Sequence, residues 1–137
     1  PMPSAFQDMF GWEEMVARVA EAYHALPHED RTVAAVNANN YGQAAAIDFF
    51  GEDHGLPKAI STHNSYWYWG PRDYTGDVML TVGVRPQALS SAFEEGEVVG
   101  VVTHPYVVWY ETNQPIIVWR HMKLPLGDAW SRMKLFY

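Results

Sequence analysis

Two short polar segments carry the residues whose types and spacing suit chemistry at a binding site. Asn39-Asn40-Tyr41-Gly42 directly follows an apolar run, and residues 63–69 read HNSYWYW. Amide side chains suit neutral polar groups such as hydroxyls better than a pyrophosphate, and aromatic faces beside them suit a carbohydrate or another polypeptide. The alternative is structural: one Asn caps the next helix, the other supports the turn, and the aromatic loop plugs the sheet end.

The candidate binding or docking residues are therefore amides, aromatic rings and one imidazole from these two segments. They are Asn39, Asn40, Tyr41, His63, Asn64, Tyr66, Trp67 and Trp69. Each segment follows a predicted parallel strand, and right-handed crossovers bring the loops after such strands to the same edge of the sheet. We expect the two segments to face each other at that carboxyl edge.

Other reactive residue types lack the arrangement that catalysis or metal binding needs. Ser61, Ser65 and His63 are close in sequence, with Asp48 as a possible third member of a triad, but no GxSxG turn surrounds a serine. No carboxylate pair has a setting distinctive of glycoside hydrolysis. His24 and His28 have i, i+4 spacing, yet a proline between them ends the helix, and zinc needs three or four converging ligands. We predict no catalytic residue, no metal site and no cofactor.

Charge and motif content argue against nucleic acid and nucleotides as partners. The chain has 16 acidic and 9 basic residues and a net charge of −7, with no basic run, whereas phosphate backbones need clustered Lys and Arg. Neither GxGxxG nor GxxxxGK[ST] occurs. The same acidity disfavours an anionic membrane surface, and no stretch approaches the roughly 20 apolar residues of a membrane span.

The elements that must position the two segments follow from hydrophobic periodicity. An amphipathic helix is predicted from Trp12 to Tyr23, ending before Pro27. The further predicted elements are strands at 32–38, 58–62, 77–84, 97–103 and 115–120, and helices at 43–50, 86–93 and 128–136. This alternation favours one α/β domain, a three-layer α/β/α sandwich with a mostly parallel sheet and an antiparallel edge near the C-terminus.

The two polar segments also carry a family resemblance. The stretches FGWEEMVARVAEAYHALP, VNANNYGQAAAIDFFGEDHGLPKAIS and THNSYWYWGP resemble the C-terminal soluble domain of bacterial multi-spanning membrane glycosyltransferases. These belong to the family related to dolichyl-phosphate-mannose–protein mannosyltransferases. The later stretches DVMLTVGV, EVVGVVTH and PIIVWRHMKLPLGDAW follow in the same order, so the resemblance covers Phe10 to Trp130. The ANNYG and HNSYWYWGP blocks are its specific parts.

The resemblance implies a place in a larger protein. In that family, membrane helices use a polyprenyl-phosphate-linked sugar, and the catalytic carboxylate lies on an extracytoplasmic loop that this chain lacks, so no catalytic residue is carried over. Residues 1–137 are then a soluble domain cut from the C-terminus of a membrane protein, consistent with a start at Pro1 rather than Met. It would lie on the periplasmic side and bind a carbohydrate or glycosyl acceptor, or support the membrane-embedded catalytic domain of the same polypeptide.

Two other interpretations stay open at this point. The chain is alternatively a stand-alone small α/β hydrolase-like enzyme with its site at the sheet edge, or a carbohydrate-binding module with no enzymatic parent.

Overall fold

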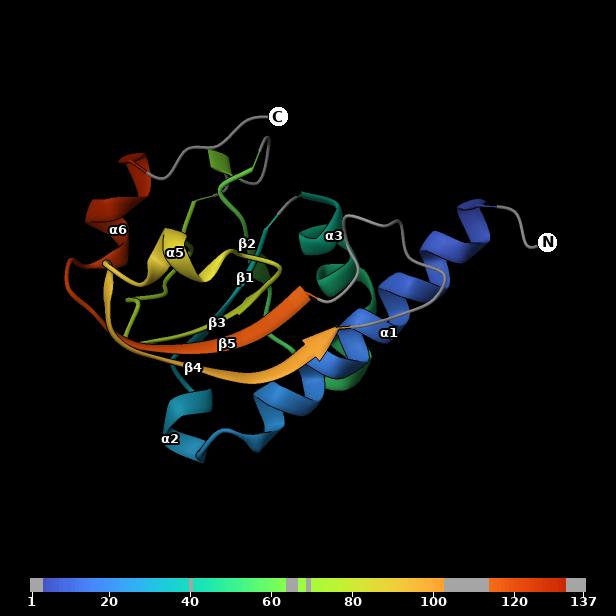
Figure 1. The fold of residues 1–137 in the computed structure, drawn as a ribbon, viewed down its shortest axis with the longest axis horizontal. Coiled ribbons are helices and arrows are strands. Elements are labelled where there is room, and N and C mark those ends of the chain that lie inside the picture. The colour runs from blue at the N-terminus through green and yellow to red at the C-terminus, as the bar shows by residue number, and fades with distance from the viewer. Residues whose placement is uncertain (1–3, 40, 64–66, 69, 103–113, 133–137) are drawn as a thin grey trace.

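The fold centres on one five-stranded mixed sheet with the strand order β2-β1-β3-β5-β4 (Figure 1). The structure, a computed structural model, describes residues 4–39, 41–63, 67–68, 70–102 and 114–132. The strands are β1 (Ala34–Ala38), β2 (Ala59–Ile60), β3 (Val78–Val82), β4 (Phe93–Val102) and β5 (Gln114–Met122). The helices are α1 (Ser4–Ala25), α2 (His28–Arg31), α3 (Tyr41–Phe50), η1 (Glu52–His54), α5 (Pro86–Leu89), α6 (Leu126–Ala129) and η3 (Trp130–Arg132).

Of the five strands described, β5 runs opposite to the other four. β1 pairs in parallel with both neighbours, so that Val36 lies opposite Ala59 of β2 and Leu80 of β3. β5 runs antiparallel between β3 and β4. The sheet is therefore parallel on one side and antiparallel toward the β4 edge, and the predicted α/β class with an antiparallel edge formed late in the chain is confirmed.

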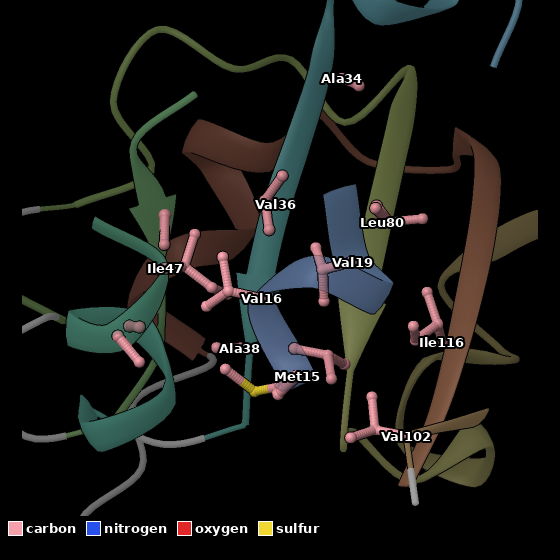
Figure 2. Close-up of a cluster of buried hydrophobic side chains, with 14 of the residues drawn as sticks. Met15, Val16, Val19, Ala34, Val36, Ala38, Ile47, Leu80, Val102 and Ile116 are labelled. Atoms are coloured by element: carbon pink, nitrogen blue, oxygen red, sulfur yellow. The ribbon is translucent and has the colours of Figure 1, made fainter. Parts of the chain in front are cut away.

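One face of the sheet is covered by α1 and α3. Val16 and Val19 of α1 are at most 1% exposed, and Figure 2 shows Val19 between Val36 of β1 and Leu80 of β3. Ile47 of α3 joins the same apolar cluster. The predicted helix stripe thus faces the sheet, and each fully buried aliphatic side chain here stabilises the fold by about 1.5–3 kcal/mol.

The opposite face holds a second apolar cluster. It is built around Met79 of β3 and Trp119 of β5, and short elements contribute Leu89 of α5, Leu126 of α6 and Trp130 of η3. Trp119 also fixes a glycine in β4, because a Cβ on Gly96 would lie 2.5 Å from its indole ring. Burial on both faces explains why every residue of β1 and β3 is buried.

Several predicted elements differ in extent from the observed ones. α1 begins at Ser4, eight residues before the predicted start at Trp12. The helix predicted to reach Phe93 ends at Leu89, and Phe93 instead begins β4. β4 begins at Phe93, four residues before the predicted start. The first half of the strand was missed because its exposed glutamates interrupt the apolar run on which the prediction rested. The last predicted helix corresponds to α6 and η3, and its residues 133–136 lie outside the described residues.

The two-residue edge strand β2 is held by side chains as well as by β1. The N–H of Ala59 donates to Asp48 Oδ1 at 2.7 Å, and the Ala59 carbonyl accepts from Arg72 Nε at 3.1 Å. Tyr74 donates its hydroxyl to the neighbouring Lys58 carbonyl at 2.9 Å. These side chains satisfy main-chain groups that a sixth strand would otherwise bind.

The hydrogen bonds that Asp48, Arg72 and Tyr74 make to the main chain at β2, here called the β2 clasp, predict a specific loss of stability. Asp48→Ala removes the acceptor for the Ala59 N–H and should lower the free energy of unfolding by about 1–3 kcal/mol, measured by urea denaturation. The matched control Asp53→Ala, on the exposed η1 turn, should stay within about 0.5 kcal/mol of the parent. Equal losses in the two variants would show that the clasp contributes nothing.

Candidate functional site

The loops that follow the three parallel strands leave the sheet at one edge. Asn37 of β1 is paired with Ile60 of β2, so the segments that begin at Asn39 and Ser61 emerge side by side. The N–H of Asn39 also donates to the Val82 carbonyl at the end of β3, at 3.2 Å. In open α/β sheets this carboxyl edge is where ligands bind.

Buried polar side chains gather at this same edge. Those identified among the described residues are Asn37, Gln43, Ser61, His63, Thr81 and Gln114, each at most 8% exposed. Three lie in or directly after β1 and β3, two follow β2, and Gln114 begins β5, whose antiparallel course starts at this edge. A buried polar group destabilises the fold unless it is hydrogen-bonded. So many buried polar side chains at one edge therefore indicate a specific polar cluster there.

A pair of amides links α3 to β5 within this cluster. Gln43 donates from Nε2 to Oε1 of Gln114. The turn after β3 makes room for them, because Gly83 has φ 74° and a Cβ there would lie 2.6 Å from Gln114 Oε1. The left-handed backbone favours glycine here, and a larger side chain would also displace the Gln114 amide from its position beside Gln43.

Two further buried polar groups have partners toward the second apolar cluster. Thr81 Oγ1 accepts a hydrogen bond from Trp119 Nε1 at 3.0 Å. Asn37 directs Nδ2 at Met79 Sδ over 3.6 Å, a weak acceptor. Both residues stand next to last in their strands, so the polar residues of β1 and β3 lie near the carboxyl ends of these two strands.

Ser61 and His63 form a tight turn after β2. The backbone N–H of His63 donates to Ser61 Oγ at 3.2 Å, and both side chains are buried. Burial lowers the pKa of His63 below its usual 6.5, so its imidazole is neutral at pH 7. Asp48, considered above as a third member of a triad, binds the Ala59 N–H and lies 3.8 Å from Arg72. These contacts are those of a turn and an edge clasp.

The structure places four of the eight sequence-predicted residues. Asn39 is half-buried at the carboxyl edge, Tyr41 begins α3, His63 is buried, and Trp67 is half-buried. Asn39 and His63 therefore belong to loops that leave the same edge, as the topology predicted. The other four lie outside the described residues: Asn40, Asn64, Tyr66 and Trp69.

Trp67 packs on the second apolar cluster and has a specific partner. Its Nε1 donates to the Trp130 carbonyl at 3.1 Å, and Trp130 Nε1 donates to the Trp67 carbonyl at 2.8 Å. The ring thus joins the aromatic loop to η3. Tyr68 beside it is 68% exposed and stacks edge-on against Trp67, with ring centroids 5.0 Å apart.

Sequence reasoning missed most of the buried polar cluster. Gln43 and Gln114 were not singled out, although each stands at the start of a predicted helix or strand. A polar residue directly beside a strand end is the signal that would have found them. Their pairing spans 71 residues, however, and only the folded sheet brings them together.

The polar side chains at this edge are uncharged, and the half-buried Asn39 is more accessible than the buried group. Amides, hydroxyls and a neutral imidazole bind hydroxyl or amide groups well and hold no fixed charge for a phosphate or carboxylate. Within the described ranges, no three His, Cys, Asp or Glu residues are grouped to hold a metal ion, and no helix is long and apolar enough to cross a membrane.

Comparisons with protein-family models, curated proteins and solved structures find no match to this chain.

The Trp67 contacts predict a structural role for that ring. Trp67→Ala removes a half-buried indole and its hydrogen bond to Trp130, so the free energy of unfolding should fall by about 2–3 kcal/mol, less than for a fully buried Trp. Tyr68→Ala, at the exposed neighbour, should cost less than about 1 kcal/mol. Chemical denaturation followed by circular dichroism measures both. A negligible loss of unfolding free energy for Trp67→Ala would contradict the structural role and favour a role for this ring in binding.

Burial of His63 predicts a pH dependence of stability. The unfolded chain binds a proton near pH 6.5, whereas the folded imidazole stays neutral to lower pH. This contribution is therefore complete above pH 6.5 and is lost as the pH falls toward the lowered folded pKa. Between about pH 7.5 and about pH 5, His63→Gln should lose less stability than the parent, while the exposed His28→Gln should follow the parent. Coincident profiles for all three proteins would rule the effect out.

Proposed function

We propose that this chain is an extracytoplasmic accessory domain of a membrane glycosyltransferase that uses a polyprenyl-phosphate-linked sugar. Its role is to bind a carbohydrate or glycosyl acceptor at the carboxyl edge of β1, β2 and β3. The observation that carries the proposal is the gathering of buried, uncharged polar side chains at that edge. Sugars present neutral hydroxyl groups, which amides and a neutral imidazole match.

Sugar transfer itself would take place in another part of the same polypeptide. The sequence resemblance places donor use and the catalytic carboxylate in a membrane-embedded part of the same polypeptide, on the periplasmic side. The present chain then supplies recognition or support. The Ser61–His63 turn favours this role over hydrolysis, because Ser61 is fully buried and accepts a main-chain hydrogen bond.

We also propose the three-layer α/β/α sandwich as the architecture of this domain. The support is that each face of the sheet carries its own apolar cluster, one with α1 and α3 and the other with α5 and α6. α5 and α6 have four residues each, so the second helical layer is built from short pieces and connecting segments.

Binding of neutral sugars tests the proposed site. Titration with a panel of mannose- and glucose-containing oligosaccharides, followed by NMR chemical shifts, should show weak saturable binding, with a dissociation constant of about 1 mM. Asn39→Ala, which removes an amide at the edge, should weaken binding about fivefold to tenfold. Thr32→Ala, two residues before β1 at the opposite edge, is the matched control and should bind like the parent.

Two results would contradict the proposal. One is the absence of binding for every neutral sugar in the panel; the other is an equal loss in Asn39→Ala and Thr32→Ala. The coding sequence upstream of Pro1 tests separately whether this domain belongs to a membrane glycosyltransferase. Several hydrophobic spans in the same reading frame favour that assignment, and a start codon at Met2 favours a stand-alone module or enzyme.

A further inference from the structure

The two edge strands of the sheet, β2 and β4, differ in length and in whether side chains bind their outward main-chain groups. β2 is a two-residue edge whose Ala59 N–H and carbonyl are both bound by side chains. β4 is a ten-residue edge, and among the described strands it pairs with β5 alone. Since a strand with one neighbour directs alternate N–H and carbonyl groups outward, β4 offers a long row of main-chain donors and acceptors.

The side chains of β4 protect only half of this row. Its first half has the exposed carboxylates Glu94, Glu95 and Glu97, the kind of residue that blocks unwanted pairing at edges. Its second half has three exposed valines: Val98 is 60%, Val99 42% and Val101 50% exposed. The register of β4 against β5 shifts between Val98 and Gly100, as it does at a β-bulge.

A groove runs beside the same strand. It has a volume of about 460 Å³ and lies between the last turns of α1 and the strands β4 and β5, which are neighbours in Figure 1. Its apolar lining comes from Ala22, Ala25 and Leu26 on the helix side and from Val99 and Val101 on the strand. Aliphatic side chains therefore have a place to be buried next to the open main-chain row.

The charge around the groove selects the partner. Arg18 is paired with Glu14 at 2.8 Å and Glu21 at 3.0 Å, and Arg120 is paired with Asp30 at 2.7 Å. Within the described part of the chain, no salt bridge involves the three β4 glutamates. Arg120 stands opposite Glu95 in the β4–β5 pairing, but its ion pair is with Asp30, so the three β4 glutamates still favour a cationic ligand.

We propose that β4 and this groove bind an extended polypeptide segment with alternating basic and aliphatic residues. The segment adds a strand to β4. Its Lys or Arg side chains lie on the face toward α1, where they meet Glu95 and Glu97 and lay their aliphatic stems against the groove. Its aliphatic side chains lie on the other face, beside Val98. A second copy of this chain is the poorer occupant, because each copy has a net charge of −7 and would bring the same glutamates. The site is distinct from the carboxyl edge, so the proposal stands apart from sugar binding.

A designed peptide tests the proposal. The probe is a ten-residue, end-blocked and fluorescently labelled peptide of alternating Val and Lys, titrated with the full chain by fluorescence polarisation. It should bind saturably, bind less tightly as salt rises, and slow amide hydrogen exchange at Val98 to Val102. Two control peptides should bind at least about tenfold more weakly: one with Glu in place of Lys, and one with a central Pro that removes a main-chain donor.

Matched charge reversals locate the site on the protein. Glu97→Lys should weaken binding of the Val–Lys peptide about threefold to tenfold, whereas Glu52→Lys, which changes the net charge equally on η1, should leave it unchanged. Equal effects of the two variants, no binding at about 1 mM protein, or unchanged exchange along β4 would each overturn the proposal. A stable dimer of the unliganded chain in sedimentation that Glu97→Lys dissociates would also overturn it, in favour of a second copy.

Discussion

Burial of β1 and β3 on both faces is the constraint from which the other features follow. Each strand has apolar clusters above and below it, so no interior position tolerates a polar side chain without a partner. Polar residues are therefore confined to the last positions of the strands and to the segments beyond them. Asn37 and Thr81 mark that boundary, and each stands one residue before its strand ends. The polar cluster thus lies at the carboxyl ends of β1 and β3 because apolar clusters cover both faces of these strands.

Local pattern predicted the elements that bury apolar side chains, and it failed where a strand is exposed. β1, β3 and α3 appear in the sequence as apolar runs or periodic stripes, and their positions were predicted within a few residues. The start of β4 was missed because Glu94, Glu95 and Glu97 belong to an edge, where solvent permits charge in every position. The candidate site divides in the same way. The shared edge of the segments after β1 and β2 follows from topology, whereas the Gln43–Gln114 pair depends on the folded sheet.

The contrast between the two sheet edges separates structural from binding surfaces. At β2, Asp48, Arg72 and Tyr74 take up main-chain groups and leave a short, closed margin. At β4, a bulge and three glutamates restrain pairing without preventing it. A protein that needs one unpaired strand for recognition must still limit nonspecific association, and partial protection by like charge achieves both.

The reciprocal bonds between Trp67 and Trp130 have a consequence for biosynthesis. The two residues are 63 positions apart, so the ribosome must add 63 residues after Trp67 before the bonds can form. At about 5–20 residues per second this takes about 3–13 s. β5 supplies Ile116 and Val118 to the first apolar cluster and Ile117 and Trp119 to the second, so neither cluster is complete before β5 has been made. The second cluster also needs Trp130 of η3, and it is therefore the last part of the core to be completed during synthesis.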